Sequence, residues 1–221
     1  MKKQFQIPRD WTFKTADVAD HFDRHVREQL PWYDLTTGVI AHVARHYIPD
    51  GGLVYDIGAS TGNVGLAIAD TLAKRNAKLV AIDNSPQMER LYRGPGQFQM
   101  TDATGFDFHP FDLAVCFLSL MFIPPAKRKG FITSLRERVR PGGAIVIFDK
   151  TVPATGYVAT VLWRLALAGK VSAGADSRDV IAKELSLSGV QRPLAPHELP
   201  GAVEIFRFGD FAGWIMEGAN G

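Results

Sequence analysis

Short apolar runs along the chain alternate with longer stretches in which apolar residues recur every three or four positions. The apolar runs cover residues 53–57, 78–82, 98–100, 112–120 and 144–148. A run without alternation is typical of a parallel strand that helices cover on both faces. The spacing between the runs leaves room for helices, so the pattern predicts βαβ units and an α/β fold with a mostly parallel sheet.

Helical periodicity dominates the first fifty residues and two later segments. Between residues 15 and 48 apolar side chains are spaced by four, and Pro31 divides this stretch into two expected helices. Residues 124–140 predict an amphipathic helix with a basic face. Residues 155–189 predict irregular helices that lie above the carboxyl ends of the strands. Two antiparallel closing strands are expected at 203–208 and 211–216.

A glycine-rich turn follows the first apolar run. The run ends at Ile57, the chain turns on Gly58 and Gly62, and a helical pattern begins at Val64. Glycines between a strand and a helix let a ligand approach the backbone and meet unpaired helix N–H groups. In an open parallel sheet this turn lies where nucleotide-like ligands bind.

Three side chains near this turn indicate which ligand it serves. Ser60 stands where a dinucleotide-binding turn has its second glycine, which disfavours a pyrophosphate. Asp56, two residues before the first glycine, suits a ligand with an ammonium and a sulfonium group. Asp83 ends the next strand, where an acceptor-only carboxylate is placed to bind both hydroxyls of a ribose. Asp83 fits any adenosine cofactor, and Asp56 favours S-adenosylmethionine.

A short-chain dehydrogenase is the alternative that the turn suggests. Its catalytic motif is Tyr-x-x-x-Lys, and none of the five tyrosines has a lysine four residues later. The dehydrogenase interpretation is therefore weak.

Composition agrees with a globular protein and limits its partners. The 221 residues are 46% hydrophobic and 22% charged, with a formal net charge of +2 that gives no argument for nucleic-acid binding. The single cysteine, Cys116, excludes an internal disulfide framework and fits a core position in a reducing compartment. Residues 1–5 lack the apolar core of a signal peptide, and no run is long enough to span a bilayer, so a cytoplasmic location is expected.

Histidine pairs and two aromatics are weaker candidates for a site. His21 and His25, like His42 and His46, are four residues apart on expected helices, but no third ligand accompanies them, so no metal site is predicted. Trp32 and Tyr33 follow Pro31. They either cover a cofactor, where an aromatic face attracts a sulfonium, or pack in the core.

The order of these features resembles class I S-adenosylmethionine-dependent methyltransferases. A narrower likeness, over about residues 10–165, is to the carboxy-S-adenosylmethionine synthases of tRNA wobble-uridine modification. The matching pieces are Asp10-Trp11-Thr12-Phe13, the Pro31-x-Tyr33 turn, Val54 to Ser60, and Ala81 to Pro86. The resemblance implies a Rossmann-like fold with an antiparallel closing strand, a helical N-terminal cap and a homodimer. It also implies that the residues matching Tyr33, Gly58, Ala59, Ser60, Asp83, Asn84, Asp102 and Ala103 hold the cofactor. Asp56, Gly62 and Phe117 complete the candidate cofactor site. Asp102 and Ala103 end the third strand, where they are placed to meet an adenine amino group.

This chain departs from the narrower family at two positions. Phe117 stands where the family has an asparagine in the fourth strand. The region matching the family's carboxylate-binding arginine reads Lys183-Glu184-Leu185-Ser186, and Arg178 and Arg192 are the nearest arginines. Losing a bidentate guanidinium weakens the prediction of carboxylate chemistry more than that of cofactor binding.

The residues leave three functions open within one expected domain. Methyl transfer to an unidentified acceptor comes first, carboxy-S-adenosylmethionine synthesis from a prephenate-like carboxylate donor second, and a non-catalytic cofactor-binding module third. In-line methyl transfer needs positioning and exclusion of water more than a catalytic triad, so no catalytic residue is assigned. The expected segments of the 1–221 domain are a helical cap at 10–50, a cofactor-binding core at 51–150, a substrate-side cap at 151–200 and closing strands at 201–221.

Overall fold

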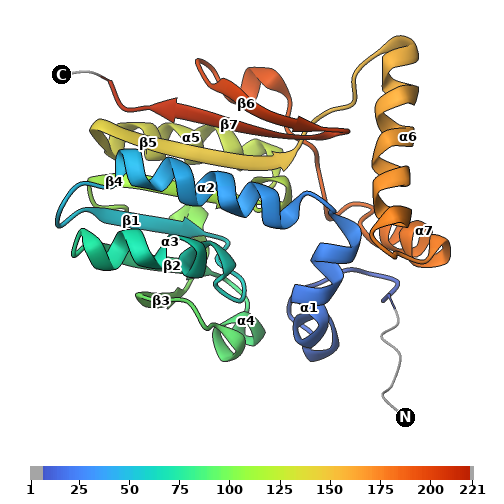
Figure 1. The fold of residues 1–221 in the computed structure, drawn as a ribbon, viewed down its shortest axis with the longest axis horizontal. Coiled ribbons are helices and arrows are strands. Elements are labelled where there is room, and N and C mark those ends of the chain that lie inside the picture. Colours follow the sequence, from blue (N-terminus) through green and yellow to red (C-terminus); the bar gives the residue numbers. More distant parts are fainter. Residues whose placement is uncertain (1–6, 220–221) are drawn as a thin grey trace.

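The computed structural model describes residues 7–219. Its central element is a seven-stranded sheet. Its strand order is β3-β2-β1-β4-β5-β7-β6 (Figure 1). The strands are β1 (Leu53–Ile57), β2 (Lys78–Asp83), β3 (Gln97–Met100), β4 (Phe111–Phe117), β5 (Val139–Lys150), β6 (Val203–Phe208) and β7 (Phe211–Glu217). β1 to β5 are parallel, and β7 pairs antiparallel with both β5 and β6. The predicted mostly parallel sheet with antiparallel closing strands is confirmed.

Helices cover both faces of the sheet and its carboxyl edge. The helices are α1 (Ala16–Gln29), α2 (Tyr33–Tyr47), α3 (Asn63–Lys74), α4 (Pro86–Leu91), α5 (Pro125–Arg138), α6 (Gly156–Ser172) and α7 (Ser177–Ser186), with 3-10 turns η1 (Ala103–Gly105), η2 (Leu120–Phe122) and η3 (Pro196–Glu198). α2 and α3 lie on one face, and α5 lies on the other. Figure 1 shows α1, α6 and α7 at the edge where the parallel strands end. The two N-terminal helices and the irregular helical segment fall where the sequence predicts them.

Two hydrophobic clusters, one on each face, hold these layers together. Val54, Leu113 and Val146 pack under α2 and α3, and the alternate residues of the same strands pack against α5. Every residue of β4 is buried, including Cys116, as expected for a central parallel strand. Full burial of one such aliphatic side chain stabilises the fold by about 1.5–3 kcal/mol.

The ends of two strands differ from the sequence prediction. The apolar run to residue 120 predicts a longer β4, but the strand ends at Phe117 because Leu118 takes a left-handed φ of 57° and the chain turns into η2. β5 begins at Val139 instead of residue 144, since Val139 already pairs with Phe111 before a register shift. Leu118 and Ser119, which follow the end of β4, line the cavity described below.

Two of the expectations from the sequence concern a membrane-spanning segment and a signal peptide. Among the described residues 7–219, no helix combines the length and apolar character needed to cross a membrane. The expectation about a signal peptide concerns residues 1–5, which lie outside the described part of the chain.

Candidate cofactor and substrate cavity

One cavity of about 300 Å³ lies above the carboxyl ends of β1, β2 and β4. Its first end is lined by Gly58 after β1, Asp83 at the end of β2 and Asp102 after β3. Its other end is lined by α1, α6 and α7 together with the N-terminal residue Trp11. The cavity therefore joins the sequence-predicted cofactor residues to a second wall that comes from distant segments.

The turn after β1 folds tightly onto its neighbours. Gly58 has a φ of 79°, and a Cβ there would lie only 2.5 Å from the Cβ of Ser119, so this position requires glycine. The N–H groups of Gly58 and Ala59 donate to the carbonyl of Ile82 at 2.8 and 3.0 Å. These contacts fix the turn against the end of β2 and bring its backbone to the cavity wall.

Asp83 connects this turn to the next one. Its carboxylate accepts from Ser60 N at 2.9 Å and from Ser85 N at 2.9 Å, one through each oxygen. Burial raises the pKa of Asp83, and the N–H groups of Ser60, Ser85 and Asn84 oppose that rise. Each oxygen retains lone-pair capacity toward the cavity that Asp83 and Asn84 line.

Asp102 and Ala103 form the corresponding part of the wall after β3. Asp102 Oδ1 accepts from both the N–H and the hydroxyl of Thr104 at 2.9 Å, which caps η1. The Thr104 N–H lowers the pKa of Asp102, although partial burial acts against it. The carboxylate stays ionised at the cavity, with Lys127 at 4.0 Å from Oδ2.

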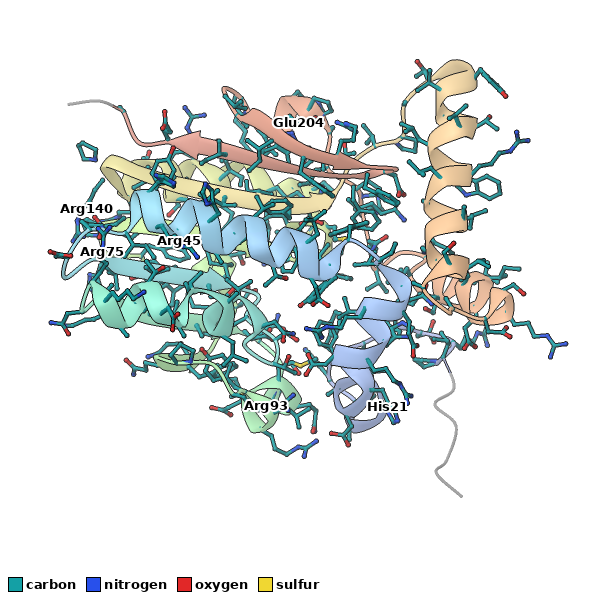
Figure 2. The ribbon with its side chains drawn as sticks, in the orientation of Figure 1. His21, Arg45, Arg75, Arg93, Arg140 and Glu204 are labelled. Carbon is teal, nitrogen blue, oxygen red and sulfur yellow. The ribbon has the colours of Figure 1, made fainter. Side chains whose placement is uncertain are left out.

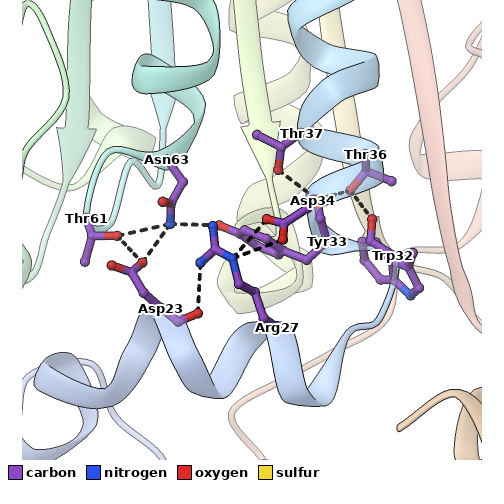
Figure 3. Close-up of polar contacts among 9 residues, drawn as sticks. All are labelled: Asp23, Arg27, Trp32, Tyr33, Asp34, Thr36, Thr37, Thr61 and Asn63. Carbon is purple, nitrogen blue, oxygen red and sulfur yellow. Dashed lines mark hydrogen bonds and ion pairs between the residues drawn. The ribbon is translucent and has the colours of Figure 1, made fainter. Parts of the chain in front are cut away.

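A polar cluster fastens α1 and α2 over the cavity (Figure 3). Asn63 Nδ2 donates to Asp23 Oδ1 at 2.8 Å and to the Tyr33 hydroxyl at 3.1 Å. Thr61 Oγ1 donates to the same Asp23 oxygen at 2.7 Å, and Arg93 contacts the other at 2.6 Å. Asp23 and Asn63 are absent from the sequence-based site. The cluster shows how the helical cap is held to the glycine-rich turn.

Tyr33 and Phe117 form the aromatic side of the same wall. Their ring centroids are 5.0 Å apart, and both line the cavity. Trp32, in contrast, packs on Phe206 and Phe211 in the core. Of the two alternatives for the Trp32-Tyr33 pair, the cavity position applies to Tyr33 and core packing applies to Trp32.

Two predicted site residues do not reach the cavity wall. Asp56 shares a face of β1 with Val54 and lies beneath α3, fully buried. Burial and the charge of Asp83 raise the pKa of Asp56 to about 7, which the N–H of Gly65 partly offsets. Gly62, with a φ of 93°, is the N-cap of α3 and packs against Gly94. Asp56 and Gly62 therefore pack behind the turn and do not line the cavity.

The second wall carries lysines that the sequence analysis did not assign. Lys150, Lys170 and Lys183 all line the cavity with Glu184. Lys150 lies 3.3 Å and Lys170 3.2 Å from the Glu184 carboxylate. Arg178 and Arg192 do not line the cavity. The cations facing this end of the cavity are therefore lysines, drawn from β5, α6 and α7.

Lys183 has an unusual environment for a lysine. Its Nζ atom lies over the ring of Trp11. Burial and the positive charge of Lys170 lower the pKa of Lys183 to about 5, and Glu184 opposes the change. Nearby, His25 stacks on Trp11 with centroids 5.2 Å apart, and burial together with Lys183 lowers the pKa of His25 to about 3. The amine and the imidazole are thus both kept neutral near neutral pH.

Other charged and histidine clusters lie away from the cavity. Figure 2 places Arg45, Arg75 and Arg140 at the opposite end of the sheet from α6. Arg140 contacts Asp112 at 2.6 Å there, which ties β5 to β4. Within residues 7–219 no group of three or more histidine, cysteine, aspartate or glutamate side chains is arranged to hold a metal ion.

Comparison with known proteins places the fold in a class. Residues 54–143 match the family model described as "Methyltransferase domain". The structure of human N-acetylserotonin methyltransferase in complex with SAM superposes with a TM-score of 0.59 at 12% identity, covering 94% of this chain and 58% of that chain. A SAM-dependent methyltransferase of Methanosarcina mazei gives 0.52 at 15% identity, covering 81% of this chain and 98% of the other. The chain has the class I, Rossmann-like methyltransferase fold.

A narrower similarity concerns the sequence. The chain is 27% identical over 213 residues to carboxy-S-adenosyl-L-methionine synthase of Staphylococcus epidermidis, covering 94% of this chain and 93% of the relative. It is 27% identical to the synthase of Pectobacterium atrosepticum, covering 82% of this chain and 76% of that protein. The resemblance predicted to about residue 165 thus extends over most of the chain.

Proposed function

We propose that this protein is an S-adenosylmethionine-dependent transferase that binds its cofactor in the cavity above β1, β2 and β4. The observation that carries the proposal is Asp83, which ends β2, faces the glycine-rich turn and lines the cavity. The residues proposed to contact the cofactor are Tyr33, Gly58, Ala59, Ser60, Asp83, Asn84, Asp102, Ala103 and Phe117. Asp56 and Gly62 are proposed to act indirectly, by fixing the turn.

The wall fits this cofactor in shape and in polarity. A Cβ at Gly58 would clash with Ser119 at 2.5 Å, so glycine at this position lets the turn pack closely and bring its backbone to the cavity wall. The buried Ser119 side chain lines the same wall. Carboxylates suited to ribose hydroxyls and an adenine amino group stand at the ends of two neighbouring strands.

Each part of the wall has a distinct task in this proposal. Asp83 accepts hydrogen bonds from the ribose hydroxyls, and Asp102 with Ala103 orients the adenine. The rings of Tyr33 and Phe117 exclude water and present their faces to the sulfonium. When bound, the cofactor supplies a methyl group activated by its sulfonium. The chain holds the acceptor in line with it, from the end lined by α1, α6 and α7.

Methyl transfer to an unidentified acceptor is the first reaction we propose. A carboxy-S-adenosylmethionine synthase is the second candidate, favoured by the similarity over most of the chain and by the lysine ammoniums at the far wall. Lys150 and Lys170 would there replace the missing arginine, although an ammonium lacks the bidentate fork of a guanidinium. That reaction would place the protein in the cytoplasm, in tRNA wobble-uridine modification. A cofactor-binding module without turnover is the third candidate function.

Product analysis by mass spectrometry separates the three functions. Purified protein is incubated with S-adenosylmethionine and either prephenate or a fractionated extract of small molecules. S-adenosylhomocysteine that accumulates only with an extract fraction supports methyl transfer. Carboxy-S-adenosylmethionine formed with prephenate establishes the second candidate. Cofactor that binds and stays unchanged in every reaction overturns the proposal of a transferase and leaves the binding module.

We also propose that residues 1–221 act as one domain and that two copies assemble through α6. This helix, which stands at the edge of the molecule in Figure 1, exposes apolar side chains on several sides: Tyr157, Val158, Val161, Trp163 and Leu165. A helix that is apolar all round is normally buried, and a second copy offers the same apolar surface in return.

Trp163→Glu is expected to shift sedimentation from dimer to monomer, whereas the exposed control Arg164→Glu leaves it a dimer. A monomeric wild type contradicts this assembly.

A further inference from the structure

The lysines at the far wall of the cavity are not equivalent. Lys150 contacts Glu184 at 3.3 Å and Asp210 at 3.4 Å, and Lys170 contacts Glu184 at 3.2 Å. Among the described residues, no carboxylate lies within ion-pair distance of Lys183. The two nearby carboxylates are thus already engaged by two of the three lysines.

The groups around Lys183 favour an uncharged amine. Trp11 covers it from the N-terminal segment, and α1 brings His25, whose imidazole is neutral. α6 brings the ammonium of Lys170, which repels a second positive charge, and only Glu184 on its own helix favours protonation. The indole face also favours an ammonium, but by less than burial disfavours it. Lys183 therefore keeps its lone pair at a pH where ordinary lysines are protonated.

Lys183 and two buried polar groups border the same end of the cavity. Lys183 lines the cavity, as do Lys150 and Lys170. Trp11 Nε1 and Gln29 Oε1, on the same wall, are buried without a hydrogen-bond partner among the described residues. Unsatisfied buried donors and acceptors of this kind are uncommon and point to a polar ligand.

We propose that Lys183 is a reactive amine that captures small carbonyl compounds bearing an acidic group, with the ammoniums of Lys170 and Lys150 attracting that group. The Lys183 nitrogen adds its lone pair to the carbonyl carbon while the carbonyl π pair moves to oxygen. The oxygen then leaves as water with both amine hydrogens, and an imine remains. A desolvated lysine beside a second cation is a recognised arrangement for such amines. The site lies at the end of the cavity that the proposed function gives to the acceptor, but imine formation is a different reaction from the proposed transfer and its test needs no cofactor.

Reductive trapping tests this site on the full-length protein without knowledge of a natural ligand. Glyoxylate and cyanoborohydride convert an imine into a stable carboxymethyl group on Nζ, which peptide mass spectrometry locates. Near neutral pH an ordinary lysine is neutral in only about one molecule in a thousand or fewer, so we expect at least roughly tenfold faster modification of Lys183 than of the exposed Lys74. The difference between the modification rates of Lys183 and Lys74 should become smaller as the pH rises to about 10, because ordinary lysines then lose their proton.

Two comparisons test whether modification of Lys183 depends on the acidic group of the aldehyde and on the charge of Lys170. With acetaldehyde, which lacks an acidic group, the ratio of Lys183 to Lys74 modification is expected to be lower than with glyoxylate. Lys170→Met removes the neighbouring charge, so modification of Lys183 should fall near neutral pH and recover in alkali. Lys183→Met should lose only its own adduct, with the far-ultraviolet circular dichroism and the other lysine adducts unchanged. Modification of Lys183 at the rate of Lys74, or none while Lys74 reacts, overturns the proposal.

Discussion

Asp83→Ala is expected to weaken binding of S-adenosylmethionine and S-adenosylhomocysteine by roughly 30-fold or more, because hydrogen bonds to a charged group contribute about 1.5–3 kcal/mol each. The variant removes the acceptor proposed for both ribose hydroxyls. It also leaves the N–H groups of Ser60 and Ser85 without the carboxylate that now accepts from them. Isothermal titration calorimetry of wild type and variant measures the difference directly.

Two controls separate loss of the site from loss of the fold. Asp70→Ala removes a carboxylate from the exposed face of α3 and should bind the cofactor as wild type does. Asp83→Asn keeps the shape and one acceptor, so its affinity should fall between those of wild type and Asp83→Ala. If Asp83→Ala folds and binds as tightly as wild type, the site is assigned to the wrong residues.

Arg128→Ala is expected to reduce the free energy of unfolding by about 3–5 kcal/mol, the usual cost of removing one partner from a buried charged network. The Arg128 guanidinium is buried and donates to the carbonyls of Ile123, Pro193 and Arg192. It also contacts the Glu198 carboxylate at 3.3 Å. This side chain ties the loop before β6 to the turn that lines the cavity.

Urea unfolding monitored by circular dichroism tests the prediction. The matched control is Arg138→Ala on the same helix, where a partly exposed guanidinium contacts Asp107 at 3.5 Å. A surface pair of this kind contributes about 0–1 kcal/mol, so the control should unfold almost as wild type does. Equal losses for the two variants would show that the Arg128 network does not hold the loop.

The end of the cavity that we propose for the cofactor could be predicted from sequence as a cluster, because its residues follow strands directly. Gly58, Asp83 and Asp102 each lie at the end of an apolar run, and parallel strands bring such ends to one edge of a sheet. Asp56 shows the limit of that reasoning. It is close to the turn in sequence, but the two-residue period of β1 directs its side chain beneath α3.

The residues at the other end of the cavity, lined by α1, α6 and α7, could not be predicted in the same way. Lys150, Lys170 and Lys183 come from β5, α6 and α7, and they meet only because the irregular helices after β5 fold back over the cavity. Local periodicity gave those helices and their general position, but it contains no information on which of their side chains face inward. Asp23 was missed for the same reason, since its partners Thr61 and Asn63 are about forty residues away.

The most direct test of a cofactor site in this cavity is mass spectrometry of the small molecule released from freshly purified, unwashed protein and from Asp83→Ala prepared in parallel. We predict S-adenosylmethionine, S-adenosylhomocysteine or carboxy-S-adenosylmethionine from the wild type, and a much smaller amount from the variant. If the wild type carries none, S-adenosylhomocysteine is added before a second release, and retention at one molecule per chain is expected. A nicotinamide nucleotide in its place, or no retention after the addition, would contradict the assignment.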